Sequence, residues 1–101
     1  MGPALNDIKR FIESMSALNK EVVEGFNQLK TYENQIRTGR YTAKQLPEMK
    51  VLEFIQRARA KKLQKLQTEF TDRFEKEKWA QIPGFDEYII SVKDKFLVGG
   101  I

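Results

Sequence analysis

The side chains that most often carry out catalysis or bind metals are largely missing from this chain. The sequence contains neither cysteine nor histidine, which excludes thiol nucleophiles, histidine bases and the usual zinc sites. The acidic neighbours Glu75 with Glu77, and Asp86 with Glu87, are too close in sequence to face the same side of a helix. There is no glycine-rich phosphate loop. We therefore expect a protein that is not an enzyme and that has no metal or cofactor.

Positive charge is concentrated in the second half of the chain. Between Glu53 and Glu69 there are five cations and no carboxylate. The cations are Arg57, Arg59, Lys61, Lys62 and Lys65. Such a stretch can follow the phosphates of a nucleic acid, and a net charge of +4 suits an acidic partner. It lacks the interleaved aromatic side chains that stack on bases. A plainer interpretation is that Glu21 and Glu24, on a neighbouring helix, pair with these cations.

Apolar side chains are unusually dense just before this basic stretch. Residues 46–58 contain more of them than one helix face can hold, whereas one neighbouring helix buries a single stripe. A second copy of the chain or the helix of a partner would have to cover the rest. We expect the contacts to be made by Leu46, Met49, Val51, Phe54 and Ala58. The alternative is that the preceding turn, which contains Tyr41, folds over these residues and buries them.

The elements that would position these residues are two long helices. Over residues 5–37, apolar positions recur with the 3.5-residue spacing of a packing helix, interrupted by Gly25. A second apolar stripe runs over residues 46–79. Between them, Gly39 is suited to end the first helix, and Thr42 with Gln45 has the form of a capping box.

The two stripes match when the chain is folded back on itself near residue 42. In an antiparallel hairpin the numbers of facing residues add up to a nearly constant value, and apolar pairs along the whole length satisfy this condition. They are Ile36–Met49, Tyr32–Leu52, Leu29–Ile55, Val22–Leu63, Leu18–Leu66, Met15–Phe70 and Phe11–Phe74. In this register Gly25 falls opposite Arg59 and Ala60. Each helix would be about 50 Å long at ~1.5 Å per residue.

A third element follows the turn signal Ile82-Pro83-Gly84. The apolar spacing after it predicts a short helix at about residues 85–97, although residues 87–92 also have strand propensity. We expect this helix to cap the hairpin by packing on Phe11, Phe70, Phe74 and Trp79. The alternative is that it docks on an anionic membrane surface with the help of Lys93 and Lys95.

The whole sequence therefore predicts an all-α protein with a single helical domain over residues 1–101, as a whole protein or a fragment of one; residues 1–3 are also compatible with a cloning remnant. The architecture is a long antiparallel hairpin (about 5–37 and 46–79) plus a short helix (about 85–97), completed to a four-helix-type bundle by self-association or a partner. No apolar run approaches the ~20 residues of a membrane span. The absence of disulfides favours an intracellular, cytoplasmic location.

The function that this architecture favours is that of a non-enzymatic protein–protein interaction module, acting as a scaffold, adaptor or assembly subunit without a small-molecule substrate. The alternative is nucleic-acid binding through residues 57–65. A weaker alternative is peripheral membrane binding through the C-terminal helix.

Overall fold

The computed structural model describes residues 4–99, with side chains through residue 93. It contains the helices α1 (Leu5–Arg37) and α2 (Gln45–Lys76), a short 3₁₀ turn η1 (Trp79–Gln81) and the helix α3 (Phe85–Gly99). The predicted hairpin and C-terminal helix are confirmed. The described residues contain no strand, so the strand alternative for residues 87–92 is wrong.

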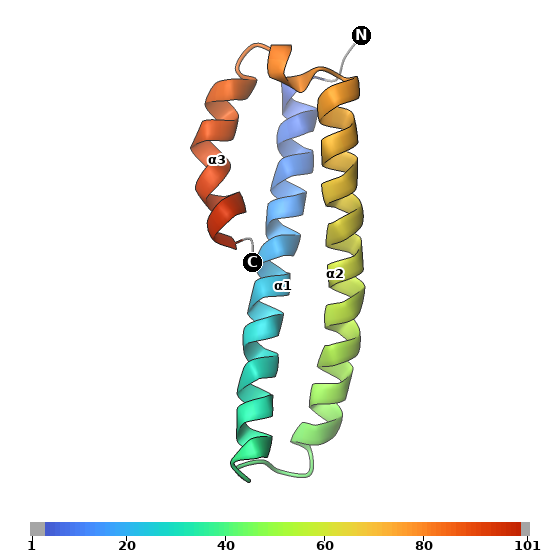
Figure 1. Cartoon of the computed structure of the whole chain (residues 1–101), viewed down its shortest axis with the longest axis vertical. Helices are drawn as coiled ribbons and strands as arrows, with labels where there is room; N and C mark the ends of the chain where they lie inside the picture. The colour runs from blue at the N-terminus through green and yellow to red at the C-terminus, as the bar shows by residue number, and fades with distance from the viewer. Residues whose placement is uncertain (1–3, 100–101) are drawn as a thin grey trace.

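The three helices form an elongated body of 57 × 21 × 17 Å. The antiparallel helices α1 and α2 lie side by side, and α3 packs on the other flank of α1, beside its first half (Figure 1). The hairpin therefore has a closed half, where α3 packs, and an open half. The open half consists of residues 23–62, which include the turn between α1 and α2. In the open half α1 and α2 lie side by side without a third helix (Figure 1).

The turn between α1 and α2 is built from local hydrogen bonds. Gly39 has a φ of 75°, and its N–H donates to the carbonyl of Ile36 while the N–H of Arg40 donates to that of Gln35. This is the pattern of a helix that ends in a left-handed glycine, as predicted. The N–H of Thr42 donates to Oε1 of Gln45 at 2.8 Å, which is one half of the predicted capping box.

Helix α2 ends at Lys76 rather than at Trp79, which corrects the predicted boundary. The cause is Lys78, which adopts a left-handed conformation with a φ of 52°. The N–H groups of Glu77 and Lys78 donate to the last-turn carbonyls of Arg73 and Glu75. Because the chain reverses at Lys78, the Trp79 side chain turns back into the core, where it is completely buried.

Apolar packing is concentrated in the closed half. Ile8, Ile12, Trp79 and Phe85 form one buried cluster. The second cluster lies at the middle of the hairpin, where the predicted pairs Val22–Leu63, Leu18–Leu66 and Met15–Phe70 pack in one group. Neither cluster extends into the open half. The apolar register is therefore confirmed for the closed half and the middle.

The register differs from the prediction at Gly25. This residue faces Gln56 instead of Arg59 and Ala60, because Gln56 occupies the face of α2 that contacts α1. The Gln56 side chain is only 2% exposed, and its Nε2 donates a hydrogen bond to the carbonyl of Val22. A side chain at position 25 would collide with it. The buried amide thus uses the Val22 carbonyl as its acceptor and depends on the missing side chain at position 25.

Candidate functional site

The basic stretch of α2 is divided between two environments. Arg59 lies near the seam, and its Nε is 3.6 Å from a carboxylate oxygen of Glu21. Pairing with Glu21 is therefore confirmed for this one cation, whereas Glu24 forms no ion pair within the described part of the chain. The other four cations are exposed and form no ion pair with any described residue. They are Arg57, Lys61, Lys62 and Lys65, and we call them the basic cluster.

The apolar residues that were expected to contact an occupant are also divided. Val51 is 59% exposed and Phe54 is 74% exposed, and Ala58 is exposed as well. Leu46 is partly exposed at the start of α2. Met49 is buried, which corrects its assignment to this surface. It precedes the seam residue Leu52 by three positions and so faces α1 instead of solvent.

The turn does not cover these side chains. Tyr41 is exposed, and so are Val51 and Phe54. The alternative in which the turn folds over the apolar residues is therefore wrong for the single chain.

The exposed apolar residues and the basic cluster form one continuous surface. Val51, Phe54 and Ala58 follow at steps of three and four and so share a row along α2. The next steps along this row reach Lys61, Lys62 and Lys65. We call the apolar row and the basic cluster together the outer face of α2, since they lie on the side turned away from α1.

Helix α3 presents a smaller exposed surface of opposite charge. Phe85 is buried, and Tyr88, Ile89 and Val92 are half-buried against the closed half, so the predicted capping role is confirmed. On the opposite side of α3, Ile90 is 64% exposed. Of the two lysines that the membrane alternative used, Lys93 is exposed, whereas Lys95 lies beyond the described side chains.

Two carboxylates lie one turn before Ile90. Asp86 and Glu87 are exposed, and neither forms an ion pair with a described residue. We call Asp86, Glu87 and Ile90 the outer face of α3.

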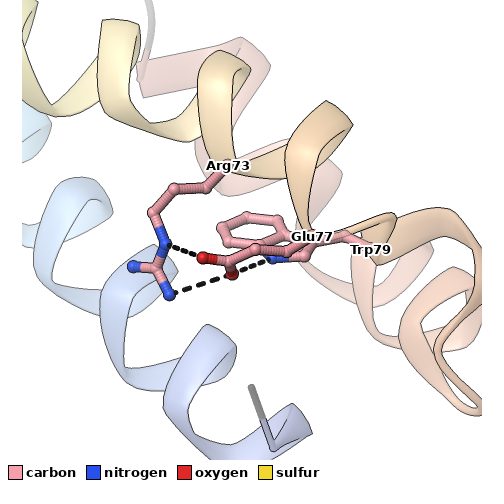
Figure 2. Close-up of polar contacts among 3 residues, drawn as sticks. All are labelled: Arg73, Glu77 and Trp79. Atoms are coloured by element: carbon pink, nitrogen blue, oxygen red, sulfur yellow. Dashed lines mark hydrogen bonds and ion pairs between the residues drawn. The ribbon is translucent and has the colours of Figure 1, made fainter. Parts of the chain in front are cut away.

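The most elaborate polar group lies at the end of α2 and was not predicted (Figure 2). The guanidinium of Arg73 donates to both carboxylate oxygens of Glu77, at 3.0 and 3.2 Å. The indole N–H of Trp79 donates to the same carboxylate at 2.8 Å. Arg73 also lies 5.2 Å above the ring of Phe11 and 5.3 Å above that of Trp79. The four-residue spacing of Arg73 and Glu77 was a sequence signal for the ion pair, but nothing indicated the indole.

This group stabilises the closed half. The hydrogen bond from Arg73 and, as a smaller effect, the one from Trp79 lower the pKa of Glu77 below its ordinary value. The hydrogen bond to Glu77 raises the pKa of Arg73, against the opposing effect of burial. The carboxylate thus stays ionised and holds the buried indole in place. Because its oxygens are already engaged by Arg73 and Trp79, we regard the group as structural.

Other kinds of site find little support in the described part of the chain. It contains no group of three or more acidic side chains placed to hold a metal ion. None of its helices is both long and apolar enough to cross a membrane. On α1, Val23, Phe26, Asn27 and Lys30 line a shallow pocket. Comparison of the chain with protein-family models, curated proteins and solved structures finds no match.

Proposed function

We propose that this chain is a non-enzymatic protein-interaction module, a scaffold, adaptor or assembly subunit that associates through the outer face of α2. The observation that carries the proposal is the exposure of Phe54, which is 74% accessible in the middle of a helix. With Val51 beside it, an apolar row faces solvent in the half of the hairpin that no third helix covers. Exposed apolar rows of this kind commonly mark the contact with another helix.

The occupant is a second copy of the chain or a helix of a partner, which would complete the open half as a four-helix-type bundle. Burial of a fully exposed phenylalanine contributes roughly 1.5–3 kcal/mol. Ala58 provides a small side chain in the same row, where a second helix can approach closely. The basic cluster lies at the C-terminal end of this contact and adds charges that select the occupant.

The test is Phe54→Glu in the full chain, with Tyr41→Glu as the matched control. Both replace an exposed aromatic side chain by a carboxylate, but only the first lies on the outer face. We expect both variants to stay folded by circular dichroism. Light scattering and capture from a cell extract should show that Phe54→Glu loses self-association or the captured proteins, while Tyr41→Glu keeps them. If Phe54→Glu matches the wild type in both assays, the proposal fails.

Nucleic-acid binding is the second candidate, favoured by the four exposed cations without an ion pair among the described residues. Arg57, Lys61 and Lys65 recur every fourth residue and could contact successive phosphates. With four such contacts, the logarithm of the affinity should fall with the logarithm of the salt concentration with a slope of about −3.6. A gel shift at ~50 mM salt that shows no complex would eliminate this candidate.

A further inference from the structure

Two of the most exposed apolar side chains of the described chain lie on different helices, and the charges that flank each of them on one side have opposite signs, although the exposed Lys93 follows Ile90 on its other side. Phe54 is followed along α2 by the cations Lys61 and Lys62. Ile90 is preceded along α3 by the carboxylates Asp86 and Glu87. Neither set of charges is paired with a described residue. Each surface thus carries an exposed apolar side chain together with charges opposite in sign to those of the other surface, so the two are complementary.

The spacings of the two surfaces also agree. On α2, the cations Lys61 and Lys62 lie three and four residues after Ala58, toward the C-terminus. On α3, the carboxylates Glu87 and Asp86 lie three and four residues before Ile90, toward the N-terminus. If the two helices are placed antiparallel with Ile90 over Ala58, the carboxylates lie level with the cations. Both separations are about one helical turn of ~5.4 Å.

These surfaces cannot meet within one chain. Helix α1 lies between α2 and α3, and α3 accompanies only the closed half, whereas the apolar row of α2 lies in the open half (Figure 1). The outer face of α3 is also directed away from the hairpin, since Phe85 on its opposite side is buried. The contact therefore requires two copies.

We propose that the occupant of the outer face of α2 is the outer face of α3 from a second copy of this chain. This inference rests on the proposed interaction role of α2 and names its partner surface. In this register Ile90 packs on Ala58 and the neighbouring Phe54, and Asp86 and Glu87 pair with Lys62 and Lys61 of the basic cluster. Because two different surfaces meet, the contact is head-to-tail. Each added copy leaves one α2 face and one α3 face free, so assembly continues unless it closes into a ring.

The test uses two complementary variants of the full chain. Phe54→Glu disables the face on α2, and Ile90→Glu disables the face on α3. Both positions are exposed, so both variants should fold, which circular dichroism checks. The wild type should gain mass above the 11.8 kDa of one chain as its concentration rises. Each variant alone should stay monomeric, with association weakened at least ~tenfold. An equimolar mixture should form a 1:1 dimer, because one intact face of each kind remains, and should not grow further.

Charge reversal provides an independent readout. The pair Lys61→Glu and Lys62→Glu, or the pair Asp86→Lys and Glu87→Lys, should each weaken association, and mixing the two proteins should restore a complex. The matched control is Lys20→Glu with Lys76→Glu, two exposed lysines outside both faces, which should leave association unchanged. Assembly of the wild type should also weaken as salt is added.

Three results would overturn the inference. The first is a wild-type chain that stays monomeric at all concentrations up to ~500 µM, a range that would detect even weak association. The second is an Ile90→Glu variant that associates like the wild type while Phe54→Glu does not. That outcome would keep the interaction role of α2 but assign it another occupant. The third is a mixture of the two variants that remains monomeric. By contrast, wild-type association that Phe54→Glu leaves intact would refute the proposed function itself.

Discussion

Replacement of Gly25 by alanine should destabilise this protein, although the same change usually stabilises a helix. Alanine in place of a glycine in a helix interior contributes roughly 0.5–1 kcal/mol of stability. Here the position faces the buried amide of Gln56 across the hairpin. The new methyl carbon would lie 2.6 Å from Cδ and 2.9 Å from Nε2 of Gln56, so the amide must move.

The expected net effect follows from three contributions. Extra atoms in a well-packed contact cost about 1–3 kcal/mol. Loss of the hydrogen bond from Gln56 to the Val22 carbonyl costs about 0.5–1.5 kcal/mol more. The higher helix propensity of alanine offsets roughly 0.5–1 kcal/mol of this loss of stability. We therefore expect Gly25→Ala to lower the free energy of unfolding by about 0.5–4 kcal/mol.

The assay is urea unfolding, followed by circular dichroism, of the wild type, Gly25→Ala, Gln56→Ala and the double variant. With alanine at position 56 the obstructing amide is gone, so Gly25→Ala should then stabilise by about 0.5–1 kcal/mol. The sign of the glycine substitution thus reverses between the two backgrounds. If Gly25→Ala stabilises the wild type, or has the same effect in both backgrounds, the described contact between Gly25 and Gln56 is wrong.

Three further predictions concern the closed half. Lys78 holds a left-handed conformation, which costs a side-chain-bearing residue about 1–2 kcal/mol, so Lys78→Gly should raise the melting temperature by several degrees; an unchanged or lower value would contradict this. The pKa of Glu77 is lowered in the folded state. Its stabilising contribution is therefore complete above its ordinary pKa and is lost as the pH falls through the lower folded value. Denaturation midpoints measured across this acidic range should show a weaker pH dependence in Glu77→Gln, and an unchanged dependence would count against the assignment. Trp79→Ala should cost about 3–5 kcal/mol, whereas Phe54→Ala should change the stability of the monomer by less than about 0.5 kcal/mol; similar losses for the two would refute the described burial.

The hairpin could be predicted because its signal is periodic. Each apolar stripe repeats over many turns, and the two stripes match in antiparallel register, so Met15 with Phe70 and Val22 with Leu63 were assigned to the same core. The capping helix was predictable for the same reason, since Phe85, Ile89 and Val92 recur at helical spacing.

Individual residues that break a pattern were harder to predict. Gln56 is a polar residue in an apolar stripe, and its burial depends on the missing side chain of Gly25 on the other helix. The end of α2 was predicted too late because Lys78 is not a residue type that usually adopts a left-handed conformation. Met49 was assigned to the exposed surface because residues 46–58 are apolar on several sides, although the antiparallel register paired it with Ile36; its burial agrees with the register.

The existence of an interaction surface was predictable from the excess of apolar residues in α2. Which side chains lie on that surface was not. Dense apolar residues before a basic stretch indicated an interaction surface, and Val51 and Phe54 are indeed exposed. That Arg59 pairs with Glu21 while the other cations remain on the outer face depends on the rotation of α2 against α1. The role of Ile90 depends on which side of α3 packs on the hairpin.

The central claim is that copies of the chain associate with one another through the outer face of α2. The most direct measurement is a dilution series of amide NMR spectra, which reports every residue whose surroundings change on association. We predict that the largest concentration-dependent shifts occur at residues 51–65, with a second group at residues 86–90. Shifts that centre instead on the α1 pocket at Val23 and Phe26, or spectra that do not change with concentration, would contradict the claim.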